Sequence, residues 1–307
     1  MLFCWVIYFM YKSLSLVFLI ILLPAVNLSC VSVPSQTQLI SAQDRGLDNT
    51  VSAACRVDRI QASLQSKLEP ARQLDSGKIS MINWNIYKAQ RQNWSEDFTA
   101  LINEQDLLLL QEATVSPLIT GLIEKQHTYW NLNTAFHYDG FEAGVLTASA
   151  IKPLFSCGLR TTEPFIRIPK TSLVSLYPIA GSDKKLLVAN LHGINFTLGV
   201  GVYGEQIRDL VEIVNQHSGP VIVAGDFNTW SEQRMDVVKN MANQLSMQAV
   251  TYKIHNRVRV FGNALDHVFY RGLEVTSENI LKVTSSDHNP IKVIFRLPES
   301  MQQLTLR

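Results

Sequence analysis

The stretch Val221-Ile222-Val223-Ala224-Gly225-Asp226-Phe227-Asn228 runs from four apolar residues through Gly225 to the polar residues Asp226 and Asn228. An apolar run of this length, bounded by Pro220 and Gly225, predicts a short buried strand. Asp226 and Asn228 are two positions apart, so in extended backbone their side chains point the same way. Such a carboxylate and amide can handle a water molecule or a metal ion. Gly-Asp-Phe-Asn also suits an ordinary turn, so its meaning depends on the rest of the chain.

Other expected strands also meet polar residues at their ends. These are Asn85 after Ile79–Trp84, Glu112 after Leu107–Leu110, His192 after Lys185–Leu191, Asp266 within Leu265–Tyr270, and Asp287 with His288 before Ile291–Leu297. Each alone has a structural explanation as a cap, a turn or a satisfied buried histidine. A carboxylate after four leucines, however, is costly to bury unless it is paired or bound to a cation. Because strand ends converge at one rim of an α/β sheet, we expect these side chains to share a site.

Strand and helix patterns are mixed over residues 78–297 and predict one layered α/β domain, followed by a tail at 298–307. Further strands are expected at Gly144–Ala148 and Ser172–Ile179. Helices are expected after an N-cap at Ser95, over Tyr203–His217 and around Val237–Leu245, where apolar residues recur at helical spacing.

The first 30 residues differ in composition from the rest of the chain. Lys12 is the only formal charge in Met1–Leu28. This apolar stretch predicts an export signal or a membrane anchor. Leu28-Ser29-Cys30 resembles a bacterial lipoprotein cleavage site, although Asn27 is unusual there, so lipidation, simple cleavage and an intact anchor stay open. We expect a protein of the cell envelope, held at the membrane or exported, with a cytoplasmic location as the alternative.

Residues 31–77 are polar and rich in Ser and Gln, which predicts a tether between membrane and domain with one short helix near Arg56–Lys67. The tether contains Cys55, one of four cysteines. None is in a C-x-x-C spacing, so a structural zinc site is not indicated. A disulfide between Cys55 and Cys157 requires an exported domain, and the sequence leaves this open.

The residue types at the expected rim indicate a reaction class. Asn, Asp and Glu supply hard oxygen ligands, which suit Mg²⁺, or else Mn²⁺, better than zinc. No Ser or Cys lies in a nucleophile-elbow pattern. Gly199–Gly204 has the spacing G-x-G-x-x-G, but it does not directly end a strand pattern, so it gives little support to a dinucleotide site. The net charge of +1 neither indicates nor excludes a polyanionic substrate. Metal-assisted attack of water on a phosphate ester fits this set best.

Six short motifs in order carry a resemblance to a known family. They are Trp84-Asn85-Ile86, Leu110-Gln111-Glu112, Asn190-Leu191-His192, Gly225-Asp226-Phe227-Asn228, Leu265-Asp266-His267-Val268-Phe269 and Ser286-Asp287-His288-Asn289-Pro290. Together they resemble the endonuclease/exonuclease/phosphatase superfamily over roughly residues 78–297. The phrases around Trp84 and His192 look closest to its YafD-like bacterial branch.

The resemblance implies a deoxyribonuclease I-like fold, an α/β four-layer sandwich of two packed mixed β-sheets flanked by helices, with the site at one rim. It implies that Glu112 is the main Mg²⁺ ligand, with Asn85 and Asp287 nearby, in a site for one or two metal ions. Asp226 would activate or position the attacking water, and Asn228 would orient the phosphate.

Two histidines complete the implied site. His288 would pair with Asp266, and His192 would donate to a non-bridging phosphate oxygen. Whether Asp226 or His288 takes the proton of the water stays open at this stage. The chain departs from several relatives at Tyr87, where they carry Asp or Arg.

Substrate contacts are the least determined part of the site. Lys88 is a candidate phosphate contact, although it also suits a plain surface lysine. Arg257 and Arg259 can meet a polyanionic backbone or form an ordinary solvated loop.

We therefore expect a monomeric, metal-dependent hydrolase of phosphate esters, and a nuclease acting on nucleic acid first of all. The alternatives are a phospholipid headgroup phosphodiesterase or inositol-phosphate phosphatase at the membrane, and a non-catalytic binding module.

Overall fold

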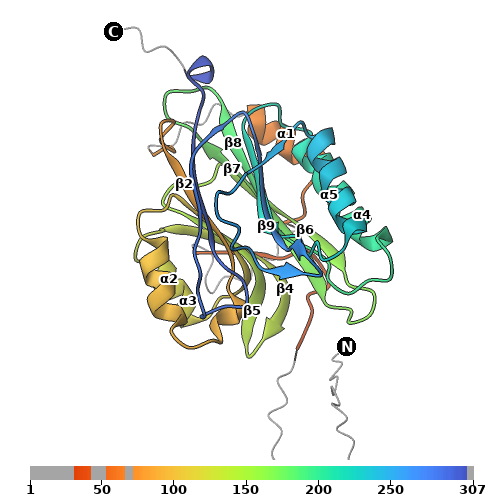
Figure 1. The fold of residues 1–307 in the computed structure, drawn as a ribbon. Helices are drawn as coiled ribbons and strands as arrows, with labels where there is room; N and C mark the ends of the chain where they lie inside the picture. The colour runs from red at the N-terminus through yellow and green to blue at the C-terminus, as the bar shows by residue number, and fades with distance from the viewer. Residues whose placement is uncertain (1–30, 43–52, 66–71, 303–307) are drawn as a thin grey trace, which may run out of the picture.

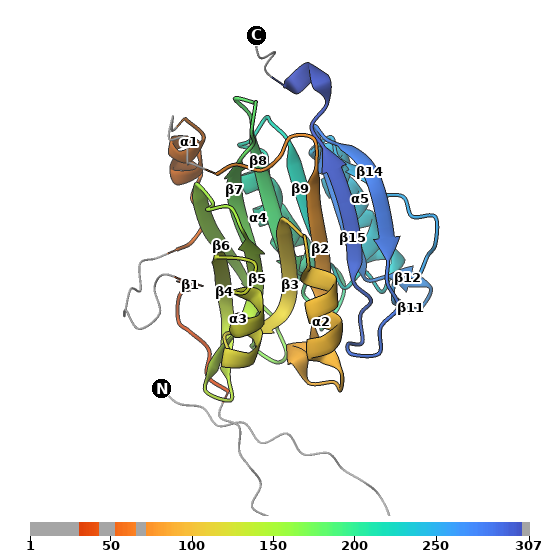
Figure 2. The same ribbon diagram turned by 90° about the vertical axis from the view of Figure 1, so that its left-hand side faces the viewer.

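The computed structural model describes residues 31–42, 53–65 and 72–302, and these form two packed β-sheets with helices on both outer faces (Figures 1 and 2). The seven-stranded sheet has the order β1 (Leu39–Ser41), β4 (Tyr129–Tyr138), β5 (Phe141–Ser149), β3 (Leu107–Thr114), β2 (Ile79–Asn85), β15 (Ile291–Arg296) and β14 (Glu274–Ile280). The six-stranded sheet has the order β10 (Gln248–Ala249), β13 (Asp266–Arg271), β9 (Val221–Asp226), β8 (Lys185–His192), β7 (Pro169–Pro178) and β6 (Phe155–Thr162).

The remaining elements cover these sheets or extend from their ends. Helices α1 (Val57–Gln65), α4 (Gly201–Val214) and α5 (Glu232–Gln244) lie on the six-stranded sheet, and α2 (Trp94–Ile102) and α3 (Pro117–Ile123) lie on the other (Figure 1). A small hairpin of β11 (Arg259–Val260) and β12 (Asn263–Ala264) and the 3₁₀ turns η1 (Tyr87–Ala89) and η2 (Glu299–Met301) complete the set. The expected four-layer sandwich is confirmed.

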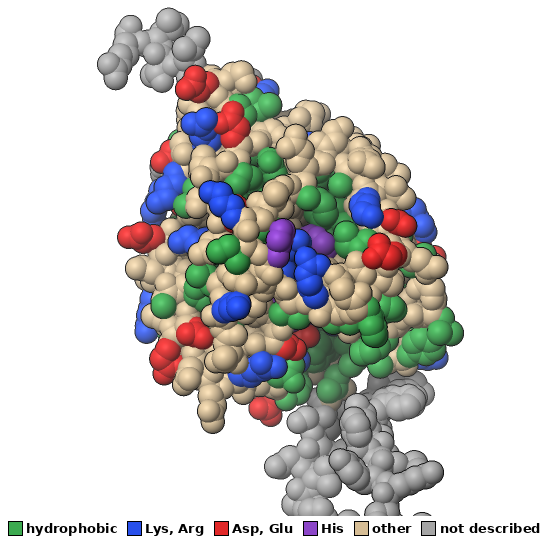
Figure 3. Space-filling model, viewed as in Figure 1, with side chains coloured by type: hydrophobic (Ala, Val, Ile, Leu, Met, Phe, Trp, Pro, Cys, Tyr) green, Lys and Arg blue, Asp and Glu red, His purple; other side chains and the backbone are tan. Residues whose placement is uncertain are grey.

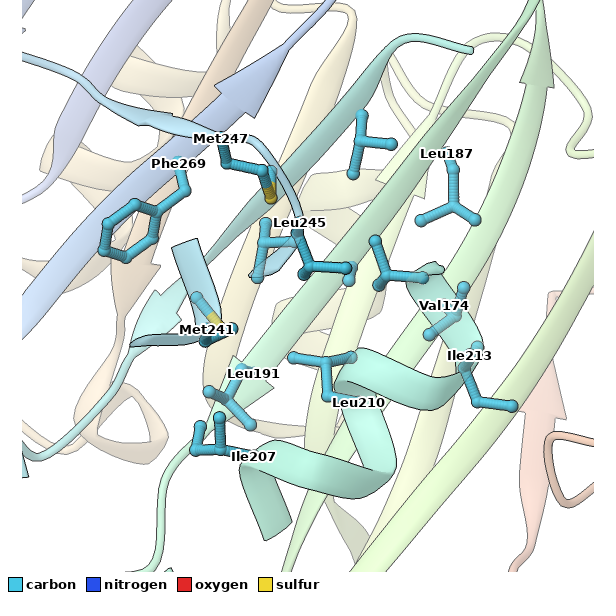
Figure 4. Close-up of a cluster of buried hydrophobic side chains, with 14 of the residues drawn as sticks. Val174, Leu187, Leu191, Ile207, Leu210, Ile213, Met241, Leu245, Met247 and Phe269 are labelled. Atoms are coloured by element: carbon cyan, nitrogen blue, oxygen red, sulfur yellow. The ribbon is translucent and has the colours of Figure 1, made fainter. Parts of the chain in front are cut away.

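The hydrophobic residues of β9 explain why this strand is central. Val221 and Val223 pack toward α4 and α5, whereas Ile222 and Ala224 pack between the sheets. The alternation of a strand therefore buries apolar side chains on both faces. Figure 4 shows the hydrophobic cluster between the six-stranded sheet and helices α4 and α5, in which Leu210 of α4 faces the sheet.

Most expected elements are present, with some differences. Helix α2 begins at Trp94 with Asn93 as its N-cap, so the prediction of a cap at Ser95 is wrong by two positions. Strands β4, β6 and β14 and helix α3 were not expected. In β14, exposed polar residues dominate, because this edge strand packs little of its surface against the core.

The described parts of 31–77 are not a polar tether. Strand β1 pairs with β4, Ile60 of α1 is buried in the outer core, and Leu74 is buried between the sheets. Cys55 and Cys157 form a disulfide that joins this segment to β6. The few apolar residues of these parts therefore pack against the two sheets, and the folded domain begins well before residue 78.

The segment 1–30, predicted to be an export signal or anchor, lies outside the described residues. Among the helices of the described ranges, none is long and apolar enough to cross a membrane.

Candidate active site

The polar residues at the strand ends meet at one rim because two parallel pairs end there. β2 and β3 run parallel with Asn85 opposite Gln111, and β8 and β9 run parallel with His192 opposite Asp226. Antiparallel β13 begins at this rim, with Asp266 opposite Asp226. Across the two sheets, Asn85 Nδ2 donates a hydrogen bond of 3.1 Å to Asp226 Oδ2.

Asp226 lies at the centre of this rim and is 2% exposed. Its Oδ1 accepts the backbone N–H of Asn228 at 3.0 Å, and Asn228 Nδ2 donates to the carbonyl of Gly193 at 2.9 Å. Asn228 adopts a φ of 52°, a conformation that asparagine tolerates better than most residues. The turn after β9 therefore fixes the carboxylate of Asp226.

His288 is held between two carboxylates. Its Nδ1 donates to Asp266 Oδ2 at 2.8 Å, and its Nε2 lies 3.7 Å from Asp226 Oδ2. Burial alone would lower the pKa of His288, but the charges of Asp266 and Asp226 outweigh it and raise the pKa to about 10. His288 is therefore an imidazolium near neutral pH, as its pairing with Asp266 suggests.

Asp226 shows the opposite balance. Burial raises its pKa to about 6, with the charge of Asp266 acting in the same direction and His288 opposing it. The group is mostly ionised at pH 7 and yet is a stronger base than an ordinary aspartate. This combination suits a group that takes a proton from water.

Lys170, at the start of β7, is a residue that the sequence analysis missed. Its Nζ donates to His192 Nε2 at 2.9 Å, and that nitrogen lies 3.5 Å from Asp226 Oδ2. Burial and the positive charge of Lys170 hold the pKa of His192 well below its usual value, so this histidine is neutral. The available signal was position: Lys170 lies two residues before the expected strand at Ser172, whose start reaches the same rim.

A second missed feature is a buried amide network behind the site. Gln111 Nε2 donates to Asn190 Oδ1 at 2.6 Å and to Asn83 Oδ1 at 2.9 Å, which links β3, β8 and β2. Both Gln111 and Asn190 lie in the sequence motifs, but only the tertiary contact between sheets reveals their part in holding the rim together.

The residues expected to bind metal lie on the seven-stranded side of the rim. Glu112 follows Gln111 at the end of β3 with a φ of 52°, and its Oε2 pairs with Nζ of Lys88. Burial favours the neutral carboxyl, but Lys88 and Lys170 outweigh it, and the pKa of Glu112 is lowered. Asp287 is exposed, next to Ser286, whose hydroxyl donates to the backbone carbonyl of Asn85 at 2.7 Å.

The donor set fits a hard divalent cation. Glu112 is ionised, only partly exposed and paired with a cation, and Asn85 and Asp287 on the adjoining segments also offer oxygen. Within the described ranges, Asp226, Asp266 and His288 form another group whose ligand atoms lie within 4.8 Å of one another. A protonated His288 is a poor metal ligand, so the Glu112 group fits better.

The arginines expected to meet the substrate occupy different places. Arg257 is partly buried, donates to the backbone carbonyl of Asp266 at 3.1 Å and lies 4.8 Å from the ring of Tyr252. It therefore supports the turn before β13. Arg259 is exposed at the β11–β12 hairpin and donates to the carbonyl of Gly262.

Comparisons with known proteins agree with the fold. The chain resembles solved structures of an endonuclease/exonuclease/phosphatase from Beutenbergia cavernae (TM-score 0.55, 16% identity, 74% of this chain and 72% of that chain) and of the human nocturnin catalytic domain with a bound sulfate anion (0.54, 20%, 73% and 96%). A mannosyl-6-phosphatase from Bacteroides thetaiotaomicron is also similar (0.53, 14%, 71% and 99%). At these identities the likeness shows the fold alone.

A family model gives the stronger result. The model described as the endonuclease/exonuclease/phosphatase family matches residues 82–288, which contain the first five motifs and Ser286-Asp287-His288 of the sixth. The match is to the family as a whole, so the YafD-like branch stays a prediction. Because the model spans more than half of the chain, the protein belongs to the endonuclease/exonuclease/phosphatase family, whose members hydrolyse phosphate esters.

Proposed function

We propose that the protein is a Mg²⁺-dependent phosphodiesterase. The observation that carries the proposal is the position of Asp226 Oδ2, 3.5 Å from neutral His192 and 3.7 Å from protonated His288, with Asn85 bonded to the same oxygen. A basic carboxylate beside an imidazolium suits attack by water on a phosphate whose negative charge grows in the transition state.

The proton of the attacking water goes to Asp226 in this proposal. His288 already carries its proton near neutral pH, so it cannot accept another, and His192 is engaged by Lys170. Asp226 is the remaining base at the centre of the rim. Of the two candidates that the sequence leaves open, the proposal therefore takes Asp226 as the base.

The positive groups around the rim bind the phosphate. His288 donates from Nε2, and Asp266 holds that imidazolium in its orientation. His192 was expected to donate to a phosphate oxygen, but its Nε2 accepts a hydrogen bond from Lys170. Lys170 therefore supplies the positive charge at this place. Asn228 orients Asp226 through its backbone N–H, and any contact with phosphate is an additional role.

Glu112, Asn85 and Asp287 would hold the Mg²⁺ ion. When bound, a divalent ion polarises a phosphoryl oxygen and offsets its developing charge. Lys88 is the counter-charge of Glu112 in this structure. If a cation took that place, the ammonium group of Lys88 would be free to contact the phosphate.

The test of the metal assignment is the variant Glu112→Gln in the full-length protein. We expect weaker Mg²⁺ binding, measured by titration calorimetry, and loss of most hydrolysis of bis-p-nitrophenyl phosphate, because a neutral amide is a weaker ligand. Glu142→Gln, on neighbouring β5, is the matched control and should behave as the parent protein. Unchanged Mg²⁺ dependence of Glu112→Gln would remove the assignment.

Two classes of substrate remain candidates. Nucleic acid is supported by exposed Arg259, although Arg257 has a structural role at the turn before β13. A phospholipid headgroup is supported by the exposed hydrophobic side chains near the rim, such as Leu198 and Phe261. Assays with plasmid DNA, RNA, phospholipid vesicles and inositol phosphates separate these substrates.

A location at the cell envelope is part of the proposal. The disulfide between Cys55 and Cys157 suits an oxidising compartment, and the apolar residues before Cys30 suit export or anchoring.

A further inference from the structure

Large hydrophobic side chains that are exposed occur at only one end of the described molecule. Nine such side chains are exposed within residues 31–42, 53–65 and 72–302, and all nine lie in segments at the active-site rim. Figure 3 shows hydrophobic side chains gathered along the lower edge of the face in view. Single exposed apolar residues are normal, but their concentration at one end marks an interaction surface.

Three of these residues lie on three separate loops, and Leu198 and Phe261 are the most exposed of the nine. Phe165 is 60% exposed and lies between β6 and β7, whose Thr162 and Pro169 pair at the rim. Leu198, 87% exposed, follows β8 after His192. Phe261, 86% exposed, is at the turn of the β11–β12 hairpin that precedes Asp266. Each loop is therefore a short continuation of a strand that supplies or adjoins a site residue.

Contacts between these loops hold them around the site. The backbone N–H of Asn195 donates to Glu163 at 2.6 Å, which joins the loop after β8 to the β6–β7 loop. Trp230 donates to Asn195 Oδ1 at 3.1 Å and its ring meets that of Phe261 edge-on at 6.5 Å. The exposed apolar tips thus project from a connected rim. We call Phe165, Ile166, Phe196, Leu198 and Phe261 the apolar rim.

The first described residues of the chain lie at the same end. Ser32 bridges to His137 near the end of β4, and His137 N donates to the carbonyl of Ser32 at 2.7 Å. The β4–β5 turn that follows is at the rim, because Ala143 of β5 pairs with Thr114 just beyond Glu112. Val31 and Val33 are themselves among the nine exposed apolar residues.

The position of Ser32 limits the distance between the folded domain and a membrane that holds the predicted anchor. The apolar stretch predicted to be an anchor ends at Leu28, four residues before Ser32. A fully extended chain spans at most about 3.6 Å per residue, so Ser32 lies within about 14 Å of the end of that stretch. If the protein keeps this stretch as a membrane anchor, the hydrogen bond between Ser32 and β4 holds the rim, and not the opposite end, next to the membrane.

We propose that the active-site end docks on a lipid bilayer through the apolar rim, and that the site hydrolyses a phosphate ester of a lipid headgroup. The naming of the substrate rests on the proposed phosphodiesterase function, whereas the docking does not. Exposed Arg167 and Arg259 lie next to the tips at Ile166 and Phe261, so each tip pairs an apolar group with a cation. This combination suits the boundary between acyl chains and anionic headgroups.

Depth in the bilayer tests the docking without any assay of activity. Full-length protein is reconstituted into phosphatidylcholine–phosphatidylglycerol vesicles, with a tryptophan introduced by Phe261→Trp or, at the opposite end, by Lys184→Trp. Acyl-chain-brominated lipid should quench the added fluorescence of Phe261→Trp and leave that of Lys184→Trp, whereas aqueous iodide should do the reverse. Equal quenching of both variants by iodide, with none by brominated lipid, overturns the docking.

A second arm tests the substrate. Phe261→Asp should lower the hydrolysis of vesicle phospholipid relative to that of soluble bis-p-nitrophenyl phosphate by about tenfold or more, because it removes buried apolar surface and adds a charge. Lys184→Asp should leave this ratio unchanged. Phe261 has a φ of 49°, which aspartate tolerates, so the variant should fold.

The outcomes separate the two proposals. Hydrolysis of DNA or RNA but not of lipid overturns the lipid substrate while leaving the phosphodiesterase function intact. No hydrolysis of any ester with Mg²⁺ overturns the proposed function, and the quenching result still decides the docking.

Discussion

Asp226 and His288 both have pKa values above the ordinary values of their side chains. Burial raises the pKa of the carboxyl to about 6, and the two aspartates raise the pKa of the imidazole to about 10. Each shift depends on the other groups of the rim, since Asp266 acts on both. The pair therefore titrates as a unit, with the base on one side of neutrality and the acid on the other.

The pH dependence of hydrolysis follows from these shifts. We expect kcat/KM to rise as pH rises through about 6, because Asp226 must be ionised to accept a proton. It should fall as pH approaches about 10, because His288 then loses the proton with which it binds phosphate. The measurement is a pH profile with the soluble ester at saturating Mg²⁺. Asp226→Asn should lose on the order of 10²–10⁴-fold in rate together with the acidic limb, and an acidic limb retained in that variant would contradict the assignment.

The pair His288 and Asp266 should behave as one unit. Losing either partner should cost rate by a similar factor, because Asp266 holds and charges the imidazole through the 2.8 Å hydrogen bond. The double variant Asp266→Asn, His288→Ala should then be little worse than His288→Ala alone, since residues that act together are non-additive.

Turnover and thermal midpoint of the parent, both single variants and the double variant give the cycle. Losses of activity that add and that follow the folded fraction would show separate structural roles instead.

At the scale of secondary-structure elements, β9 must lie very close to β8 for the rim to form. A Cβ added at Gly225 would lie 1.9 Å from the carbonyl oxygen of Leu191. Only glycine therefore permits the strand to deliver Asp226 beside His192.

Gly225→Ala tests this close approach. We expect a loss of about 3 kcal/mol of stability by denaturant unfolding, because backbone must move, and a larger loss of turnover than the unfolded fraction explains. Gly121→Ala in α3 is the matched control. An added Cβ there meets nothing within 4 Å, so the helix should gain about 0.5–1 kcal/mol. Equal stability of the two variants would contradict the interpretation of Gly225.

At the scale of the whole molecule, the described residues before β2 attach to both sheets. The disulfide between Cys55 and Cys157 spans 102 positions and holds α1 against the six-stranded sheet, where Ile60 is buried. Its loss frees a long stretch of the unfolded chain and loosens this attachment.

Cys55→Ser should lower stability by about 2–5 kcal/mol. A reducing agent should lower the free energy of unfolding of the parent protein by a similar amount, measured by denaturant unfolding, and should leave that of Cys55→Ser unchanged. A parent protein that is insensitive to reduction would contradict a structural role for this bond.

Much of the fold was predictable because local patterns agree with the tertiary structure. The local patterns of the apolar runs Leu107–Leu110 and Val221–Ala224 predict strands, and both runs are strands of the fold. The short helix expected near Arg56–Lys67 is present as α1. Strands β14 and β1 were missed because their residues are polar or sparsely apolar, and they gain structure only from pairing with strands of the sheet.

The candidate rim residues Asn85, Glu112, Asp226, Asp266 and His288 are predictable from the sequence, because several polar groups at the ends of buried strands are costly unless they share partners or a cation. The tertiary structure was needed to show the charge states of Asp226 and His288, the contact of Lys170 with His192 and the structural use of Arg257. It also decided that the start of the described chain and the apolar rim share the active-site end. The physical reason is that charge states and surfaces depend on distances between segments far apart in the chain, which no local pattern encodes.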